Sequence, residues 1–415
     1  MIKQEQINKR SSLLNGHPPP SLLQIPQKAG FQLILLTLAD LIARTAYQMG
    51  KTPLLPLYAA TLGADELFLG FIASVSTMTG LVFKPLIGLL SDRHGRRLWL
   101  LIGTMFFIGM PFVYQFISSP EQLVVVRLIH GFATAIYGPV SMAMVVELAP
   151  DNRAARVGLF SLGRTGGYIF GPALAGFFLL TQAPVEVFSI IGFLSLFALV
   201  PVLLLPDHNG HANSKIEQDL AFWDQLKAGI GTAAMTPAIW LAGSFEAINY
   251  MVTYTAKAFL PIYALSVGRN VLEAGLFFTV QQTVTMIAKP SLSWIADRYR
   301  PLRVISLAAL GLAIALIMLT FSANFVVFFG AAMLLGLAEA LIIPASTAMI
   351  ANQIESANTG AGLGFLGTLQ NGSKIIGPII AGFFITLIGY ESTFQAMAFS
   401  IIAGCCMMGW SLRKA

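Results

Sequence analysis

The sequence predicts an all-α membrane protein with twelve transmembrane helices in two pseudo-symmetric six-helix bundles. Its composition is the first indication, because hydrophobic residues make up 56% and charged residues 11% of the 415 positions, with a mean hydropathy of +0.74. Soluble domains carry roughly 25% charged residues. The second indication is a series of apolar stretches long enough to cross a bilayer. The third is a set of glycine, proline and charged motifs that recur 205 residues apart.

A helix needs about 20 mostly apolar residues to cross the hydrocarbon core. We expect spans at residues 30–60, 66–90, 98–118, 122–149, 155–181, 185–206, 236–266, 271–295, 302–321, 325–351, 359–387 and 391–411. The expected organisation is a tail at 1–29, a first bundle at 30–206, a linker at 207–235 and a second bundle at 236–415. The tail holds basic residues and prolines without an apolar core, so we expect a flexible segment and no cleaved signal peptide.

The distribution of Lys and Arg predicts that both termini are cytoplasmic. One set of alternate loops, with the two chain ends, holds sixteen basic residues: Lys3, Lys9, Arg10, Lys28, Arg93, Arg96, Arg97, Arg153, Arg156, Lys215, Lys227, Arg298, Arg300, Arg303, Arg413 and Lys414. The opposite loops hold Arg269 beside Asp65, Glu66, Glu121, Glu186, Glu273 and Glu391. Basic residues concentrate on the cytoplasmic side of membrane proteins. We therefore expect a multi-pass protein of the cell membrane, with the bacterial inner membrane as its setting.

Pairing each residue with the one 205 positions later aligns the two halves of the chain. The aligned pairs include Pro56 with Pro261, Tyr58 with Tyr263, Gly63 with Gly268, Gly70 with Gly275, Lys84-Pro85 with Lys289-Pro290, Asp92-Arg93 with Asp297-Arg298, Gly131 with Gly336 and Pro139 with Pro344. A shift to 206 aligns Gly158 with Gly364, Gly171-Pro172 with Gly377-Pro378 and Gly176 with Gly382. Such a parallel duplication predicts two bundles that can rock against each other around a central site.

The loop after the second span, Gly88-Leu89-Leu90-Ser91-Asp92-Arg93-His94-Gly95-Arg96-Arg97, fits the G-x-L-a-D-R-x-G-R-[KR] signature of the major facilitator superfamily. On this motif the chain resembles that family over residues 30–411. The fifth span carries Gly158, Gly167, Gly171, Pro172 and Gly176, with Ala175 where a glycine is usual, and is similar to the helix signature of its drug:proton antiporters. In the second half, Arg300 stands where the loop glycine would be. The resemblance implies the twelve-helix fold and secondary transport.

The resemblance also implies a gate at the charged loop. Asp92 would dock on the eleventh span and lock the outward-open state, and Arg96 would contact the acid at the end of the fourth span, Glu147. The candidate gating residues are Gly88, Asp92, Arg93, Gly95, Arg96, Arg97, Glu147, Asp297 and Arg298. The alternatives are that these charges only set topology, and that the glycines of the fifth span only allow close helix packing.

Polar side chains recur at helical spacing within several predicted spans. A charged group near the bilayer centre costs at least ~2.5–3.5 kcal/mol, so these groups should face a water-filled cavity. The candidate cavity residues are Arg44, Tyr47, Gln48, Arg127, His130, Thr134, Asn249, Tyr250, Tyr254, Lys257, Gln370, Asn371 and Lys374. In the family that the chain resembles, spans 1, 4, 7 and 10 line the cavity.

Three intramembrane carboxylates are candidate proton carriers: Asp40 first, then Glu246 and Glu339. A carboxylate held between a low-dielectric surrounding and a nearby guanidinium can exchange protons near neutral pH. The alternative for Asp40 is a structural ion pair with Arg44, four residues along the same helix. For His130, a hydrogen-bonded place between helices is the more common role than a proton relay.

Other classes of protein fit the sequence less well. The cysteines are adjacent, Cys405 and Cys406, and the five histidines are scattered, so neither a disulfide framework nor a metal or cofactor site is predicted. Gly50-Lys51-Thr52 resembles the end of a phosphate-binding loop but lies within a membrane span. The sequence shows no nucleophile elbow and no filter-like loop, which disfavours an enzyme and a channel. The scattered basic residues form no nucleic-acid-binding face.

We therefore expect a secondary transporter that works by alternating access on the proton gradient. The main hypothesis is proton antiport that exports small amphipathic compounds or drugs. The alternative is proton-coupled movement of one specific metabolite, sugar or siderophore, uptake included, and a non-transporting sensor of the same fold stays open. The mixed charges of the predicted cavity do not choose the charge of the substrate. The expected partners are the lipid bilayer, a small-molecule substrate and protons, and we expect a monomer.

Overall fold

A computed structural model of the chain describes residues 27–148, 153–206, 235–351 and 359–414. The helices are α2 (Gln27–Lys51), α3 (Leu54–Thr61), α4 (Glu66–His94), α5 (Arg96–Val113), the 3-10 helix η1 (Tyr114–Phe116), α6 (Pro120–Glu147), α7 (Arg153–Phe178), α8 (Pro184–Leu204), α10 (Pro237–Ser266), α11 (Val271–Arg298), α12 (Pro301–Leu319), α13 (Phe325–Ala351) and α14 (Thr359–Lys414). The described residues contain no strand. The expected tail and linker lie almost wholly outside the described residues.

These helices account for every predicted span. The first span is α2 followed by α3, because Pro53 has no N–H with which to continue the helix. The last two spans are the arms of α14 on either side of Gly389, where φ is +80°. By length and hydropathy alone, nine helical segments of the described residues could cross a membrane, and the last of them includes both arms of α14. Helices α7 and α10 are not among the nine, because glycine, tyrosine and charged residues lower their hydropathy.

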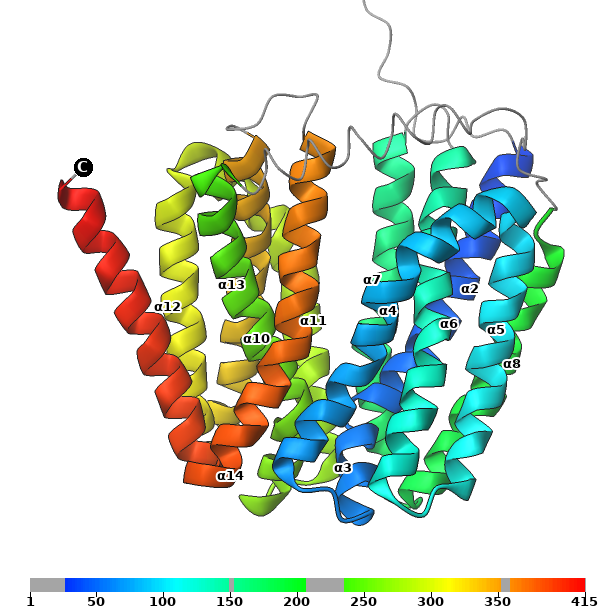
Figure 1. Cartoon of the computed structure of the whole chain (residues 1–415), viewed down its shortest axis with the longest axis horizontal. Coiled ribbons are helices and arrows are strands. Elements are labelled where there is room, and N and C mark those ends of the chain that lie inside the picture. Colours follow the sequence, from blue (N-terminus) through cyan, green and yellow to red (C-terminus); the bar gives the residue numbers. More distant parts are fainter. Residues whose placement is uncertain (1–26, 149–152, 207–234, 352–358, 415) are drawn as a thin grey trace, which may run out of the picture.

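The helices gather into two groups, which stand side by side in Figure 1, α2 to α8 in one and α10 to α14 in the other. Each group has its own apolar core. Phe107, Ile136 and Val140 are buried together in the first bundle. Leu312 and Phe328 belong to the larger core of the second bundle.

The helix ends define two sides of the molecule. Helices α4, α6, α8 and α11 begin on the side that we call the acidic side, each with a glutamate in its first turn. A negative charge is favourable there because helix N-termini carry a partial positive charge. Asp65 also caps α4, accepting a hydrogen bond of 2.7 Å from the Phe68 N–H. The opposite side, which holds the turn at Gly95 and the end of α11 at Arg298, is the basic side.

The duplication is visible in the backbone. Gly63 after α3 and Gly268 after α10 have φ of +83° and +84°, a conformation that glycine adopts without the strain of a side chain. Gly95, between α4 and α5, also has a positive φ of +89°. Its counterpart Arg300 has φ of −58°, so the second turn takes an ordinary residue. This difference explains why the motif loses its glycine in the second half.

Two glycines bring the bundles into backbone contact on the acidic side. A Cβ atom on Gly70 of α4 would lie 2.2 Å from the Pro378 carbonyl oxygen of α14. A Cβ atom on Gly275 of α11 would lie 2.3 Å from the Pro172 oxygen of α7. The two contacts are related by the repeat, since both the glycines and the prolines are aligned pairs. Small residues therefore hold the bundles together, as is common between membrane helices.

A pair of hydroxyl groups one helical turn further on repeats the same symmetry. Ser74 Oγ donates a 2.7 Å hydrogen bond to the Ile375 carbonyl, and Thr279 Oγ1 donates a 2.8 Å hydrogen bond to the Ile169 carbonyl. Ser74 and Thr279 are 205 residues apart, and the two acceptors are 206 apart. Both hydrogen bonds cross between the bundles.

A shared apolar core completes this junction. Leu54 and Tyr58 of α3 are buried in one cluster with Phe259 of α10 and with Ala381 and Ile385 of α14. Both hydroxyl bonds and both glycine contacts fall in the first third of α4 and α11, which begins on the acidic side. The bundles are therefore joined and sealed at the acidic side.

Candidate functional site

Asp40 lies at the centre of a buried ion pair network in the first bundle. Arg164 of α7 donates to both carboxylate oxygens of Asp40, from Nε at 3.0 Å and from Nη2 at 2.9 Å. The predicted partner Arg44 is more distant, with Nη2 at 3.7 Å from Oδ1. Ser141 of α6 accepts a 2.9 Å hydrogen bond from Arg164 Nη2. The network ties α2, α6 and α7 together around a carboxylate with no exposed surface.

Arg164 is the important residue that the sequence analysis did not select. Its signal was present, because an arginine in the middle of a glycine-rich membrane helix needs an acidic partner. The bidentate geometry makes Arg164, rather than Arg44, the main partner of Asp40. The expected pair within α2 is thus one part of a larger network between helices.

A second cluster of polar side chains lies inside the first bundle. Arg127 Nη2 donates a 2.7 Å hydrogen bond to Ser76 Oγ, and the hydroxyls of Ser76 and Tyr47 are 3.1 Å apart. His130 Nδ1 lies 3.1 Å from the Tyr114 hydroxyl, and the His130 ring stands edge-on to Tyr47. Because His130 is 3% exposed and enclosed by rings, it occupies a place between helices and does not face open water. Thr134, also predicted to line the cavity, bonds back to the Gly131 carbonyl of its own helix.

Half-buried lysine and tyrosine side chains from both bundles meet near the middle of the molecule. We call these residues the lysine–tyrosine cluster: Lys51, Tyr168, Tyr250, Tyr254, Lys257 and Lys374. The ring centroid of Tyr254 lies 4.7 Å from Lys51 Nζ, 5.3 Å from Lys257 Nζ and 5.9 Å from Lys374 Nζ. Ammonium groups at these distances from a ring are attracted to its face.

The cluster crosses from one bundle to the other. Lys51 belongs to α2 of the first bundle and Tyr254 to α10 of the second. In the reverse direction, Lys257 of α10 lies 5.7 Å from the ring centroid of Tyr168 in α7. Lys374 of α14 lies 4.1 Å from the ring centroid of Tyr250. Tyr168 was missed at the sequence level, because a single uncharged tyrosine within a membrane helix gives no distinct signal.

Glu246 of α10 is fully buried, and one of its oxygens has no partner among the described residues. Gln370 of α14 donates to Oε2, whereas Oε1 makes no hydrogen bond. Asn249, one turn further along α10, is also buried, and both atoms of its amide lack a partner in the described part of the chain. Asn371 is half-buried next to Gln370. Glu246 and Asn249 are therefore groups for which a proton, water or ligand could supply the missing hydrogen bonds.

Glu339 of α13 has amide partners from α11. Gln281 Nε2 and Gln282 Nε2 lie 3.4 and 3.3 Å from its Oε2. Neither glutamine was predicted from the sequence as a site residue, although two adjacent amide side chains in an apolar span are unusual. Glu339 is half-buried and forms no ion pair among the described residues.

The charged loop forms a local ion network on the basic side. Arg96 Nη2 lies 3.0 Å from Asp92 Oδ1, and Arg96 Nη1 lies 2.7 Å from Glu147 Oε2, the contact that the family resemblance implied. Arg97 Nη2 donates to the Leu203 carbonyl near the end of α8. The Asp92 and Glu147 side chains are 58% and 48% exposed, so these pairs add little to stability.

The expected docking of Asp92 on the eleventh span is not seen among the described residues, because Asp92 pairs with Arg96 of its own bundle. Arg93 is exposed in the last turn of α4, and Gly88 has open space where a Cβ would lie. In the second half, Arg298 is exposed at the end of α11. The side chain of Asp297 lies outside the described part of the chain.

The glycine motif of the fifth span acts mainly through packing. A Cβ on Gly167 would lie 2.7 Å from Arg44 Cβ, and one on Gly171 would lie 2.6 Å from Gln48 Cβ, so these glycines let α7 approach α2. Gly176 would meet the Val271 carbonyl of α11 at 2.8 Å, next to the contact that Pro172 makes with Gly275. Gly158 has nothing within 4 Å of such a Cβ, and the structure gives no packing reason for it.

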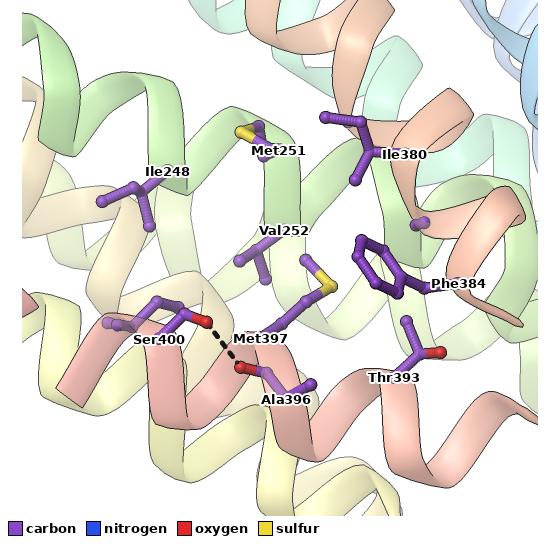
Figure 2. A pocket seen from close by; sticks show the side chains of 12 residues that line it. Ile248, Met251, Val252, Ile380, Phe384, Thr393, Ala396, Met397 and Ser400 are labelled. Carbon is purple, nitrogen blue, oxygen red and sulfur yellow. Dashed lines mark hydrogen bonds between the residues drawn. The ribbon is translucent and has the colours of Figure 1, made fainter. Parts of the chain in front are cut away.

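A pocket of about 260 Å³ lies in the second bundle between α10 and both arms of α14. Figure 2 shows its lining, which includes Ile248, Val252, Phe384 and Met397 and a hydrogen bond from Ser400 to the Ala396 carbonyl. Its lining residues are apolar or uncharged, and Phe384 is 44% exposed. None of the predicted proton carriers or cavity residues lines this pocket. The described residues hold no group of three His, Cys, Asp or Glu side chains that could bind a metal.

Comparison with known proteins agrees with this architecture. The family model described as Major Facilitator Superfamily matches residues 36–247 and 244–414. The multidrug resistance protein MdtG of Proteus mirabilis is 24% identical over 360 residues, which cover 83% of this chain and 87% of MdtG. The quinolone resistance protein NorA of Staphylococcus aureus is 24% identical over 344 residues, covering 80% of this chain and 84% of NorA.

A solved structure of the nucleoside transporter NupG (D323A mutant) superposes with a TM-score of 0.78 at 15% sequence identity, covering 91% of this chain and 98% of NupG. This likeness concerns the fold. The family model spans nearly all the described helices, and the relatives it groups are membrane transporters and not enzymes. The chain belongs to the Major Facilitator Superfamily.

Proposed function

We propose that this protein is a proton-coupled exporter of small amphipathic compounds that works by alternating access. The observation that carries the proposal is the symmetric junction on the acidic side, where each bundle contributes one glycine contact and one hydroxyl bond. This junction consists of small-residue contacts, hydroxyl bonds and an apolar cluster that is distinct from the two bundle cores, so it can open without unfolding either core.

We assign the basic side to the cytoplasm, following the concentration of Lys and Arg there. The state described by the structure is then closed to the outside. In this state the ion pair of Asp92 in the described part of the chain is with Arg96 of its own bundle, in keeping with a cytoplasmic latch that is released when the outer side is sealed.

Among the three predicted carriers, we assign the proton to Glu246. Its Oε1 is buried without a hydrogen-bond partner among the described residues, and its Oε2 accepts a hydrogen bond from the neutral amide of Gln370. Protonation would give Oε1 a hydrogen to share and would remove a buried charge. Asp40, bound by Arg164 and Arg44, instead serves as a fixed tie between α2 and α7.

The names of the relatives support export of drugs as the activity. MdtG is a multidrug resistance protein and NorA a quinolone resistance protein. We extend this activity to the present chain because each alignment covers at least four-fifths of the chain and includes both bundles.

The proposal is tested in everted membrane vesicles, whose cytoplasmic face is outward. Respiration acidifies the vesicle interior, and this acidification quenches the fluorescence of an acridine dye. A fluoroquinolone or ethidium added outside should relieve this quench by exchange with internal protons, and vesicles without the protein should show no such change. If the protein is present in the membrane and neither compound relieves the quench, proton-coupled export of such drugs is refuted.

A further inference from the structure

The described centre of the molecule contains more basic than acidic side chains. Arg44, Lys51, Arg127, Arg164, Lys257 and Lys374 are the basic residues of the networks above, and Asp40, Glu246 and Glu339 are the acidic ones. Lys374 is attracted by Glu246 and Glu339, but among the described residues none of the three acids forms an ion pair with a lysine. Asp40 is taken up by Arg164 and Arg44, and the hydrogen bonds of Glu246 and Glu339 come from glutamine amides.

The three lysines of the lysine–tyrosine cluster have aromatic rings as neighbours. Among the described residues, Lys51, Lys257 and Lys374 form no ion pair with a carboxylate. Each is half-buried within the span of its helix and lies within cation–π distance of Tyr254. Three like charges around one ring repel one another, and the low-dielectric surroundings strengthen the repulsion.

An anion placed among these ammonium groups would remove that repulsion. The rings of Tyr168, Tyr250 and Tyr254 would meanwhile offer faces to an aromatic or apolar body. A cation would meet the opposite situation, because the three ammonium groups would repel it. The arrangement of these side chains therefore favours an anionic substrate over a cationic one, whereas the residue types alone did not indicate the charge of the substrate.

We propose that the lysine–tyrosine cluster binds the anionic group of the transported compound, a carboxylate, sulfonate or phosphate carried on an aromatic or apolar body. This inference rests on the proposed function and specifies its substrate class. An anion held there would contact α2 and α7 of one bundle and α10 and α14 of the other. Such a ligand would contact both bundles, which must move relative to each other during coupled transport.

The test measures equilibrium binding to the purified full-length protein by calorimetry, with three probes that share one ring system. Naphthalene-1-sulfonate is a permanent anion, naphthalene-1-sulfonamide is neutral, and trimethyl(1-naphthyl)ammonium is a permanent cation. The sulfonate should bind at least tenfold more tightly than the other two. Each of Lys51→Gln, Lys257→Gln and Lys374→Gln should weaken sulfonate binding roughly tenfold, the usual scale for one charged hydrogen bond.

Arg303→Gln is the matched control, because it removes one positive charge from an exposed site at the start of α12. Its affinity for the sulfonate should equal that of the wild type. Sulfonate binding no tighter than sulfonamide binding, or equal loss in Arg303→Gln, would overturn the inference.

Binding needs no proton gradient, so its outcome is separate from that of the vesicle assay. Exchange with ethidium but not with the sulfonate in vesicles would leave proton-coupled export intact and remove the anion as its substrate.

Discussion

Arg164 and Asp40 are joined by two hydrogen bonds across 124 residues of sequence, and this pairing defines how α7 lies on α2. The carboxylate side of the contact is fully buried and the Arg164 side chain is 20% exposed, and Ser141 and Arg44 extend the contact. The glycines of α7 make it possible, because Gly167 lets the helix backbone approach Arg44 closely enough for Arg164 to reach the carboxylate. A glycine motif and an ion pair thus serve one helix–helix interface.

Replacing Asp40 by Asn should mainly lower stability. The substitution leaves Arg44 buried and Arg164 half-buried without a carboxylate, and breaking a fully buried pair costs about 3–5 kcal/mol, which is an upper bound here. We expect a clear drop in the thermal unfolding temperature in detergent. Asp40→Asn combined with Arg164→Gln should recover part of that loss, because it removes the uncompensated charge. Wild-type stability with selective loss of pH-driven transport would instead identify Asp40 as the proton carrier.

The fold was predictable from the sequence because its signals are local. Apolar length gives the spans, and aligned pairs such as Gly63 with Gly268 mark turns that need the same positive φ in both halves. The break at Pro53 was not predicted, since it depends on how a short connection settles in the folded chain, whereas the break between the last two spans was predicted and lies at Gly389.

The site was predictable only in part, because spacing identifies residues on one helix face but not their partners on other helices. The Asp40–Arg44 spacing suggested a pair within α2, whereas the shorter contact comes from Arg164 in α7. Tyr168 belongs to the site because the packing of α7 against the second bundle brings its ring close to Lys257. Partner choice across helices is a property of the tertiary structure.

Replacing Glu246 by Gln should separate proton coupling from binding. The amide keeps the size of the side chain but cannot release a proton, so transport driven by a pH gradient should fall at least tenfold. Exchange of substrate for substrate without a gradient should persist. Glu339→Gln is the matched control, because Glu339 already has two amide partners and is not assigned the proton. Unchanged pH-driven flux in the Glu246 variant would refute the assignment.

Removing the symmetric hydroxyl bonds should loosen the acidic-side junction. Ser74→Ala and Thr279→Val each delete one hydrogen bond between bundles, worth about 0.5–1.5 kcal/mol, which shifts the closed-to-open ratio roughly 2- to 10-fold. In the double variant, the closed-to-open ratio should shift by the product of the two single shifts. Ser400→Ala is the control, because Ser400 bonds only within its own helix.

The shift can be measured by the distance between spin labels on the acidic side, one at Gln182 after α7 and one at Ala323 before α13, in a background where both cysteines are replaced by serine. A longer-distance population should grow in each single variant and most in the double variant. Distances that stay as in the wild type would show that these bonds do not control closure.

The two charged turns should differ in their tolerance of alanine. Gly95 has φ of +89° and ψ of 132°, a region that residues with a Cβ occupy at a cost of about 1–3 kcal/mol. Gly95→Ala should therefore lower the thermal unfolding temperature and disturb the Arg96 pairs that follow the turn. Arg300→Ala, at the equivalent position with φ of −58°, should leave that temperature nearly unchanged. Equal effects of the two substitutions would show that the glycine of the motif is needed for a contact and not for its backbone conformation.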